Sequence, residues 1–353
     1  MKSFVATAPG APLEECEVEN PIPQGREVLV RTIRSGVCHT DLHSHAGGYD
    51  LGSKGFFSMT GRGLKYPSVW GHEIVGEVVS VGPEVTETKV GDIRLVFPWI
   101  GCGECVRCQN SESNLCRQSN AIGVFRWGGF ATHCLVPDED YLIDIEGLDP
   151  SWAATLACSG VTSYAAVKKV LPAEDGDTVV VIGAGGVGLN AVAILSAMTK
   201  VRIAVVDVSD ERLEIAKSLG AHQVVNSTKL SEGDTLSDVL GGPIHAAIDF
   251  VNNGATFSLA FDTLDKAGTL VPVGLFGGET TIPNAMMPLR AMSILGSYVG
   301  NLTELRELVE FVKVNELPKL PINERELSLE AVSTAMDELE NGRVSGRIIL
   351  TGV

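Results

Sequence analysis

The stretch Thr178–Met198, TVVVIGAGGVGLNAVAILSAM, carries the clearest fold signal in the chain. Its first five residues form an apolar, β-branched run, as in a strand that is buried on both faces. In the turn that follows, Gly183 permits the sharp bend, Gly185 lets the backbone approach a pyrophosphate, and Gly188 lets the next helix pack closely on the strand. The stretch therefore predicts a dinucleotide-binding turn, and an ordinary glycine-rich turn is the alternative.

Strands and helices alternate around this stretch, which predicts an α/β fold with a doubly wound parallel sheet. The expected strands are Thr178–Ile182, Val201–Val206, Ala246–Phe250 and Leu270–Val273, and the expected helices are Val187–Met198 and Asp210–Leu219. Before about residue 160, short β-like runs lie between Gly and Pro residues and predict a β-rich part: Glu27–Ile33, Ile74–Val81 and Ile93–Phe97. After Tyr298 we expect the helices Leu302–Val314 and Leu329–Glu340 and a final strand, Gly346–Thr351.

Asp207 ends the second expected strand, 24 positions after Gly183. A carboxylate at this point can accept hydrogen bonds from the ribose hydroxyls of an adenosine and would repel a 2′-phosphate, which favours NAD over NADP. Arg212 lies five residues further on and could bind the ribose or partly offset that repulsion.

Four cysteines, Cys102, Cys105, Cys108 and Cys116, follow the spacing C-x2-C-x2-C-x7-C. This spacing predicts a closed tetrahedral zinc site, which can hold a loop together but leaves no position for chemistry. Disulfides are the alternative, and they would need an oxidising compartment. The chain begins Met-Lys-Ser-Phe without a signal-peptide pattern and lacks an apolar run of roughly 20 residues, so we expect a cytoplasmic protein without a membrane partner.

Composition narrows the range of partners. A length of 353 residues predicts about two domains, and the 44% of hydrophobic residues suffices for a large core. The formal net charge of −17 argues against nucleic acids and anionic membranes, which require a basic surface. A small-molecule substrate is therefore expected.

Cys38, His72 and Cys158 come from three separate segments, Cys-His-Thr-Asp, Gly-His-Glu and Ala-Cys-Ser-Gly. Two thiolates and one imidazole make a three-ligand zinc site that leaves a fourth position open, as catalytic zinc requires. Each residue alone is a weak signal, because a single buried cysteine is more often a small core residue. Their order, beside a dinucleotide turn and a four-cysteine cluster, gives them weight.

The chain resembles the zinc-dependent medium-chain alcohol dehydrogenases from end to end. The match lies in Gly36-Val-Cys-His-Thr-Asp41, Gly71-His-Glu73, Cys102–Cys116, Cys158, Gly183–Gly188 and Gly346-Arg347. The resemblance implies a GroES-like catalytic domain over residues 1–159 and 298–353, with a structural-zinc lobe at about 99–118, and a Rossmann domain over residues 160–297. It also implies a homodimer or homotetramer, formed through the sheet edge near Leu289–Ser297.

The resemblance further implies reversible hydride transfer between NAD and a primary or secondary alcohol, giving an aldehyde or ketone, with two zinc ions per subunit. In this reading Cys38, His72 and Cys158 bind the catalytic zinc. Thr40 then bonds the reacting oxygen, His43 passes the proton to water, Asp41 orients His72, and Glu73 lies behind the metal. The residues implied at the cofactor are His39 and Arg347 at the pyrophosphate, Thr162, Val273, Gly274 and Leu275 at the nicotinamide, and Gly183, Gly185, Gly186, Val187, Gly188, Asp207 and Arg212 elsewhere along NAD.

One segment departs from the yeast-type enzymes of this family: His72 follows Cys38 by 34 residues, roughly ten more than in those enzymes. The extra length falls in Gly47–Tyr66, which contains Lys54, Arg62 and Lys65. We hypothesise that this loop lines the substrate pocket and pairs a basic side chain with the carboxylate of an ω-hydroxy acid. A solvated or subunit-contact loop is the alternative. Further candidates for the pocket wall are Trp99, Trp127 and Tyr298.

Two other functions are compatible with parts of this pattern. A zinc-free quinone or enone reductase of the same fold would not need the Cys38, His72 and Cys158 set. A non-enzymatic, zinc-stabilised NAD-binding module would retain both motifs without hydride transfer. Metal content and NADH formation with alcohols distinguish the three.

Overall fold

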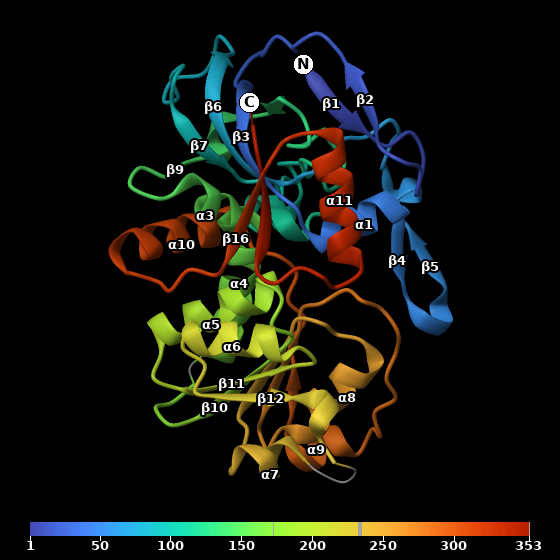
Figure 1. Cartoon of the computed structure of the whole chain (residues 1–353), viewed down its shortest axis with the longest axis vertical. Helices are drawn as coiled ribbons and strands as arrows, with labels where there is room; N and C mark the ends of the chain where they lie inside the picture. Colours follow the sequence, from blue (N-terminus) through green and yellow to red (C-terminus); the bar gives the residue numbers. More distant parts are fainter. Residues whose placement is uncertain (172, 232–234, 353) are drawn as a thin grey trace.

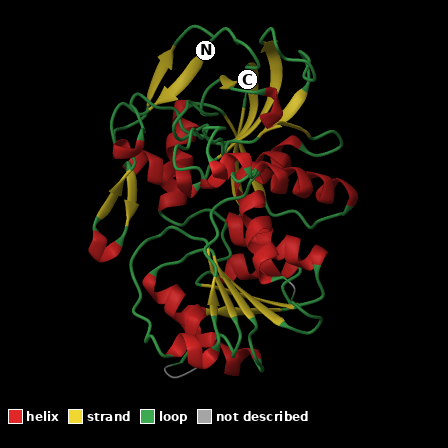
Figure 2. Ribbon diagram, turned by 180° about the vertical axis from the view of Figure 1, so that it is seen from behind, coloured by secondary structure: helices red, strands yellow, loops and turns green. Residues whose placement is uncertain are grey.

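The computed structural model describes residues 1–171, 173–231 and 235–352. Two large sheets occupy opposite ends of its long axis, with helices between them, and both chain termini lie at the same end (Figure 1). Figure 2 gives the view from behind, in which the lower sheet is seen as a fan of adjacent strands. The expected combination of a β-rich part and a doubly wound parallel sheet is confirmed.

The first sheet has seven strands, most of them antiparallel, in the order β16-β17-β3-β6-β7-β9, with β8 also paired to β3. The strands are β3 (Val28–Gly36), β6 (Glu73–Val81), β7 (Ile93–Val96), β8 (His133–Val136), β9 (Leu142–Asp144), β16 (Ile322–Glu326) and β17 (Arg347–Thr351). A separate pair, β1 (Lys2–Val5) and β2 (Glu14–Glu17), lies beside it. Because β17 pairs antiparallel with β3, the end of the chain returns to its beginning.

The second sheet has six parallel strands in the order β12-β11-β10-β13-β14-β15. They are β10 (Thr178–Ile182), β11 (Arg202–Asp207), β12 (Gln223–Asn226), β13 (Ala246–Asp249), β14 (Thr269–Pro272) and β15 (Ser293–Ile294). All five residues of β10 are buried, and they alternate between two faces: Val179 and Val181 belong to one hydrophobic cluster, Val180 and Ile182 to another. This two-sided burial explains why the strand lacks polar alternation.

Helices cover both faces of the parallel sheet (Figure 1). On the side of the first sheet lie α4 (Val161–Val170), α5 (Gly186–Met198) and α6 (Asp210–Ser218); on the other lie α7 (Leu236–Leu240), α8 (Gly254–Thr263) and α9 (Met286–Arg290). The remaining helices are α1 (His39–Ala46), α2 (Val106–Gln109), α3 (Pro150–Thr155), α10 (Leu302–Val314) and α11 (Leu329–Glu340). The predicted bounds of α10 and α11 are confirmed, since Asn301 and Ser328 cap their first turns.

The extra segment Gly47–Tyr66 differs from the loop that the sequence suggests. It contains a short antiparallel hairpin, β4 (Gly48–Asp50) and β5 (Phe56–Ser58), which projects from the first half toward the second (Figure 1). Gly48 permits this pairing, because a Cβ there would lie 2.0 Å from the carbonyl oxygen of Phe57. We refer to residues 48–58 as the β4–β5 hairpin.

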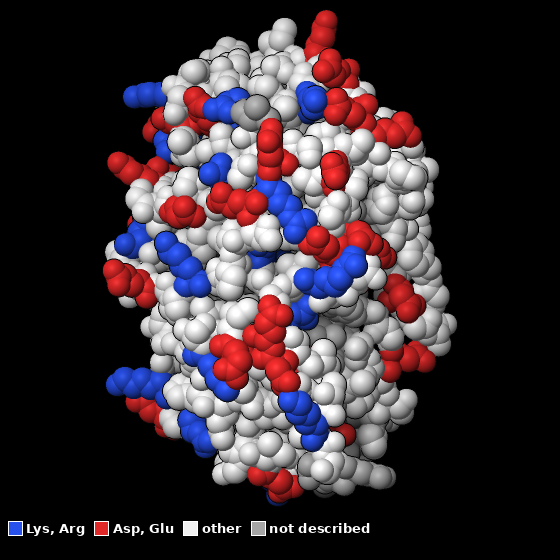
Figure 3. All heavy atoms as spheres, in the orientation of Figure 1, with Lys and Arg blue, Asp and Glu red and all other residues white. Residues whose placement is uncertain are grey.

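The surface carries both signs of charge. On the face seen in Figure 3, acidic and basic side chains are interspersed, and the basic ones drawn there do not gather into a patch. Among the helices of the described residues, none combines the length and apolar composition needed to cross a membrane.

Candidate active site

A cavity of about 480 Å³ lies between the two halves of the molecule. Its wall combines the start of α1, the segment before α4, the glycine turn and the last strand. It is lined by the predicted residues Cys38, His39, Thr40, His43, Trp99, Cys158, Thr162, Gly183, Gly185, Gly186, Val187, Gly188, Asp207, Arg212, Val273, Gly274, Leu275, Tyr298 and Arg347. Asp41, His72 and Glu73 are fully buried behind this wall.

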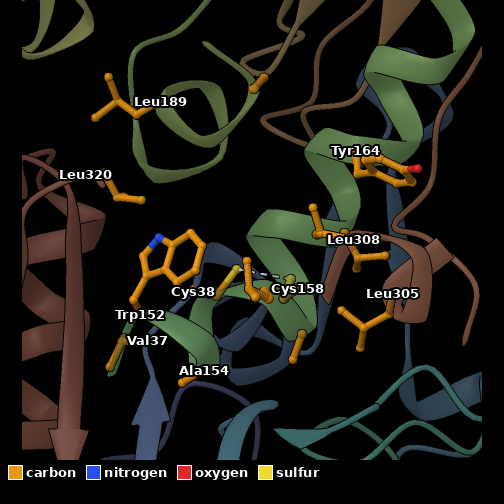
Figure 4. Packing of buried hydrophobic residues seen from close by; sticks show 14 of the residues in the cluster. Val37, Cys38, Trp152, Ala154, Cys158, Tyr164, Leu189, Leu305, Leu308 and Leu320 are labelled. Carbon is orange, nitrogen blue, oxygen red and sulfur yellow. Dashed lines mark hydrogen bonds between the residues drawn. The ribbon is translucent and has the colours of Figure 1, made fainter. Parts of the chain in front are cut away.

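Three predicted metal ligands converge at the cavity, and we call Cys38, His72 and Cys158 the three-residue cluster. Cys38 lies between β3 and α1, His72 directly precedes β6, and Cys158 lies in a π-helical turn over Leu156–Gly160. Their ligand atoms lie within 4.8 Å of one another, and the two sulfurs are 3.9 Å apart (Figure 4). Their hydrogen bond lowers the pKa of Cys38 well below its ordinary value, although burial opposes this, so Cys38 favours the thiolate that metals bind.

Asp41 fixes the orientation of this cluster. Its carboxylate accepts hydrogen bonds from the backbone N–H of Cys38 at 2.9 Å and of Gly71 at 3.0 Å. It also lies 3.0 Å from Nδ1 of His72, and because a carboxylate only accepts, that nitrogen carries the proton. Nε2 of His72 is therefore the ring nitrogen available to a metal, and it is buried without a hydrogen-bond partner. A buried imidazole nitrogen facing two sulfurs fits a zinc ion in the donor set of a catalytic site.

Glu73 and Arg347 form a buried ion pair next to the cluster. Glu73 accepts hydrogen bonds from Nη2 of Arg347 and, at 3.1 Å, from the backbone N–H of Ser159. Burial raises the pKa of Glu73 to about 7, and the guanidinium of Arg347 partly offsets the rise. Arg347 also reaches the glycine turn, since a Cβ on Gly186 would lie 2.3 Å from its Cδ. One arginine thus lies between the carboxylate behind the cluster and the turn expected at the pyrophosphate.

Thr40 and His43 lie on the first turns of α1 and face the cavity. The hydroxyl of Thr40 is 4.0 Å from the sulfur of Cys38. The ring of His43 lies 4.8 Å from that of Tyr49, tilted by 39°; Tyr49 belongs to the β4–β5 hairpin and was not among the predicted site residues. Burial lowers the pKa of His43, so its ring is neutral at pH 7 and able to accept a proton.

The glycine turn has the geometry that its sequence predicts. Gly183 has a φ of +92°, which favours glycine, and a Cβ on Gly188 would lie 1.8 Å from the carbonyl oxygen of Gly183. Asp207 closes the turn from β11, because its carboxylate accepts hydrogen bonds from the N–H groups of Ala184 at 2.6 Å and Ser209 at 2.9 Å. Arg212 donates to the carbonyl oxygens of Gly342 and Val344.

The four cysteines of the lobe over residues 99–118 do not line this cavity, although Trp99 at its start does. The four sulfurs of Cys102, Cys105, Cys108 and Cys116 lie within 4.8 Å of one another, and all eight cysteines of the chain are free thiols. Backbone N–H groups of Glu104 and Cys105 lower the pKa of Cys102 to about 7, which favours its thiolate. The geometry fits a closed zinc site in place of disulfides.

Comparison with known proteins identifies the family. The family model for the alcohol dehydrogenase GroES-like domain matches residues 24–147, and the model for zinc-binding dehydrogenases matches residues 186–314. An NAD-dependent alcohol dehydrogenase of Sulfurisphaera tokodaii is 35% identical over 346 residues, 97% of each chain. The chain belongs to the zinc-type medium-chain alcohol dehydrogenase family.

Other relatives of this dehydrogenase cover its whole length. An alcohol dehydrogenase of Geobacillus stearothermophilus is 36% identical over 353 residues, 99% of this chain and 98% of the other. The crystal structure of the alcohol dehydrogenase from Aeropyrum pernix superposes with a TM-score of 0.89 at 30% identity and covers 99% of this chain and 100% of that one. The protein is accordingly an NAD-dependent alcohol dehydrogenase with zinc and NAD as cofactors, which sets aside the non-enzymatic alternative.

The candidate pocket residues of the dehydrogenase separate into two groups. The ring of Trp99 lies 5.3 Å from that of His72 and 6.5 Å from that of Tyr298, and both Trp99 and Tyr298 line the cavity. Trp127, in contrast, donates its Nε1–H to the carbonyl oxygen of Pro67 and does not line the cavity. Arg62 lies over the ring of Phe57 at 4.4 Å and is likewise absent from the lining.

A second cavity of about 780 Å³ extends the first one beneath the β4–β5 hairpin. The two share Tyr49, Asn253, Gly274, Leu275 and Tyr298. The wall of the second cavity includes Glu279, which accepts a hydrogen bond of 2.6 Å from the hydroxyl of Ser53 at the tip of the hairpin. Tyr49 was missed as a cavity residue. The only sequence signal for it is that it is aromatic and lies in the extra segment, six residues after His43.

Proposed function

We propose that this enzyme is a zinc-dependent alcohol dehydrogenase whose catalytic zinc is held by the three-residue cluster and whose second zinc is held by the four-cysteine lobe. One observation carries the proposal: the partnerless Nε2 of His72 faces two cysteine sulfurs at the wall of the cavity that also contains the glycine turn. A zinc-free reductase would have no use for this arrangement. Two sulfurs and one nitrogen would hold zinc with three ligands and would leave a fourth position for substrate.

When bound, zinc supplies Lewis-acid polarisation of an alcohol and NAD accepts its hydride. The chain then has to position the substrate and move one proton. The hydroxyl of Thr40, beside Cys38, hydrogen-bonds the substrate hydroxyl, and the neutral ring of His43 accepts the proton on its way to solvent. Asp41 holds His72 in the required tautomer, and Glu73 with Arg347 fixes the wall behind it.

For the cofactor we assign the pyrophosphate to the glycine turn with His39 and Arg347, the adenosine ribose to Asp207 with Arg212, and the nicotinamide to Thr162 with residues 273–275. Thr162 supports this assignment, because its buried Oγ1 has no hydrogen-bond partner and lies at the cavity. We assign residues 1–159 and 298–353 to a catalytic domain and 160–297 to the cofactor domain. Free thiols fit a reducing compartment, and we therefore place the enzyme in the cytoplasm.

Among primary and secondary alcohols we favour substrates with a bulky uncharged part, such as cyclic or aromatic alcohols. Tyr49, Phe57 and Phe257 provide apolar surface in the second cavity. Lys54 is the basic residue of its lining, but the carboxylates of Asp50 and Glu279 lie in the same wall and offset its charge. This balance argues against the ω-hydroxy acid that the basic residues of the loop suggest.

The zinc assignment is tested with Cys158→Ala and, as a control, Cys16→Ala, which removes a thiol outside both clusters. We expect two zinc ions per subunit in the wild type and the control. Cys158→Ala should retain one and form NADH from alcohols about a thousandfold more slowly, because several kcal/mol of charge stabilisation is lost. A Cys158→Ala enzyme with unchanged rate would favour the zinc-free reductase.

The substrate class is tested with ethanol, cyclohexanol, benzyl alcohol and 6-hydroxyhexanoate on wild type, Lys54→Met and the control Lys65→Met. We expect the larger neutral alcohols to have the highest kcat/KM, unchanged by either substitution. A tenfold loss confined to 6-hydroxyhexanoate with Lys54→Met would instead support the hydroxy acid.

A further inference from the structure

Buried hydrogen bonds join the segment of Cys158 to the first turns of α5, the helix that follows the glycine turn. They depend on Asn190 of α5 and Ser163 of α4, two residues that have no role in the assignments above. Asn190 is only 4% exposed, and Ser163 is fully buried. Two polar side chains at such depth need partners, because an unpaired polar group inside a protein is costly.

Asn190 reaches the neighbour of Cys158. Its Nδ2 donates to the hydroxyl of Ser159 at 3.1 Å. That hydroxyl donates its single hydrogen to the carbonyl oxygen of Thr155 at 2.9 Å, so its lone pairs face Asn190. The backbone N–H of Ser159 bonds Glu73. Asn190 is therefore one hydrogen bond away from the residue after Cys158 and two away from the carboxylate behind the three-residue cluster.

Ser163 connects the same two helices through backbone atoms. Its hydroxyl oxygen lies 2.8 Å from the carbonyl oxygen of Ser159 and 2.7 Å from that of Val187. A hydroxyl has one hydrogen and can donate to only one of the two at a time. Val187 lies in the first turn of α5 and lines the cavity. The turn expected at the pyrophosphate and the turn that holds Cys158 thus share one hydrogen.

The π-helical turn over Leu156–Gly160 makes these bonds more consequential. A π turn follows a rare i→i+5 hydrogen-bond pattern that is frequent at functional sites, and here the hydroxyl of Ser163 gives the carbonyl oxygen of Ser159 a further donor. Apolar packing comes from α10, whose Leu305 and Leu308 lie near Cys158 in Figure 4. The polar partners come from Ser163 and, through Ser159, from α5.

We propose that Asn190 and Ser163 are positioning residues that couple NAD binding to metal retention by Cys158, an inference that rests on the proposed zinc ligands. A dinucleotide that orders the first turn of α5 holds Ser159 in place, and Cys158 with it. The coupling is reciprocal. Metal in the three-residue cluster raises the affinity for NADH, and NADH raises the affinity for metal by the same factor.

The test measures the zinc affinity of the enzyme by equilibrium competition with a colorimetric chelator, with and without saturating NADH. For wild type we expect NADH to raise the affinity for one zinc by about fivefold or more, in the usual range of coupling between sites. The zinc of the four-cysteine lobe is an internal reference, and its affinity should not respond. NADH affinity, measured by fluorescence with and without metal in the cluster, should change by the same factor as metal affinity.

Asn190→Leu retains the side-chain size without the donor, and Ser163→Ala removes the shared hydrogen. Each should reduce the protection by NADH to less than about twofold, with the lobe unaffected. The control is Thr263→Val, which removes a comparable helical hydrogen bond, from Oγ1 to the carbonyl oxygen of Leu259, on the other face of the parallel sheet. It should retain the wild-type protection.

Unchanged protection in a folded Asn190→Leu or Ser163→Ala enzyme would overturn the inference, as would wild-type affinities for both zinc ions that do not depend on NADH. If Asn190→Leu does not fold, Ser163→Ala decides the question alone. A wild-type protein that binds one zinc would overturn the proposed function and the inference with it, so the two failures are distinguishable.

Discussion

At the scale of residues, the site owes its chemistry to partners that fix protonation. His72 can offer Nε2 to a metal because Asp41 accepts from Nδ1. The hydrogen bond with Cys158 lowers the pKa of Cys38 and favours its thiolate, and His43 is neutral because burial disfavours its charged form. A close hydrogen-bond partner sets the protonation of His72 and Cys38, and burial sets that of His43, in the sense that the proposed reaction needs.

His43 predicts a pH dependence. Burial lowers its folded pKa below the ordinary value of 6.5, so the neutral, proton-accepting form persists down to that lower pKa. In wild type, kcat/KM for alcohol oxidation should fall as the pH drops through it. His43→Gln should be slower by at least about tenfold at pH 7 and lack this acidic limb. His45→Gln on the same helix is the control; an unchanged limb in His43→Gln would exclude the relay.

Asp207 predicts coenzyme preference. Removing its charge with Asp207→Ser should lower the ratio of kcat/KM for NAD over NADP by about ten- to a hundredfold, since repulsion of a 2′-phosphate by a nearby carboxylate is on the order of 1–3 kcal/mol. The control is Asp210→Ser, which lies three residues after Asp207 and removes an exposed carboxylate that pairs with Lys229. Steady-state kinetics with both coenzymes measures the ratio, and an equal effect of the two substitutions would contradict the assignment.

At the scale of elements, strand and helix ends deliver the functional groups. Cys38 and Asp41 lie where β3 gives way to α1, and His72 and Glu73 lie at the start of β6. β3 and β6 pair at Gly36 and Glu73, and a Cβ on Gly36 would lie 2.0 Å from Oε2 of Glu73. The missing side chain at Gly36 therefore makes room for the carboxylate behind the three-residue cluster.

Glu139 predicts how the loop over residues 86–88 is held. Burial raises its pKa, but backbone N–H groups of Thr86, Glu87 and Thr88 outweigh this, with Arg26 adding to them, and hold it at about 2. A lowered folded pKa stabilises the protein above about pH 4.5, and this contribution is lost as the pH falls toward 2.

Glu139→Gln should therefore destabilise the protein by about 2 kcal/mol at neutral pH, the size expected for hydrogen bonds to a buried charge. Thermal unfolding at pH 7 and pH 4 measures this, and the difference from wild type should be smaller at pH 4. The control is Asp140→Asn, an exposed partner of the same Arg26, whose loss should cost less than about 1 kcal/mol. Equal losses for the two variants would contradict the account.

At the scale of the whole molecule, function depends on how the two halves meet. The three-residue cluster belongs to one half and the glycine turn to the other, and the cavity lies between them. The contacts that bridge the halves include Arg347 between Glu73 and Gly186, and Ser53 with Glu279. Substrate and cofactor can therefore meet only where both halves contribute a wall.

The free edge of the parallel sheet predicts self-association. β15 is the last strand in the sheet, and Leu289 and Leu295 beside it are 72% and 42% exposed. Exposed apolar side chains along an unpaired edge favour pairing with a second copy. Leu295→Lys should shift an oligomer toward monomers in light scattering, whereas Val314→Lys, at a site 80% exposed on α10, should not. Equal masses for Leu295→Lys and wild type would exclude this edge.

The sequence by itself determined the local features: the strand–turn–helix of the dinucleotide site, the closed four-cysteine cluster, and helices α10 and α11 to the residue. These depend on neighbours within one or two turns, through glycine sterics, ligand spacing and helix capping. Cys38, His72 and Cys158 lie 34 and 86 residues apart and share no local pattern, so their role was predicted from their residue types beside the other motifs and from the family resemblance.

Only the tertiary structure decided which of these distant residues contact one another. It brought the three ligands within 4.8 Å and paired Arg347 with Glu73. It also folded the extra segment into a hairpin, with Tyr49 at the cavity and Arg62 outside it. The physical reason is that such contacts depend on strand register and on the packing of the two halves, which arise from long-range burial and leave no periodic trace in the sequence.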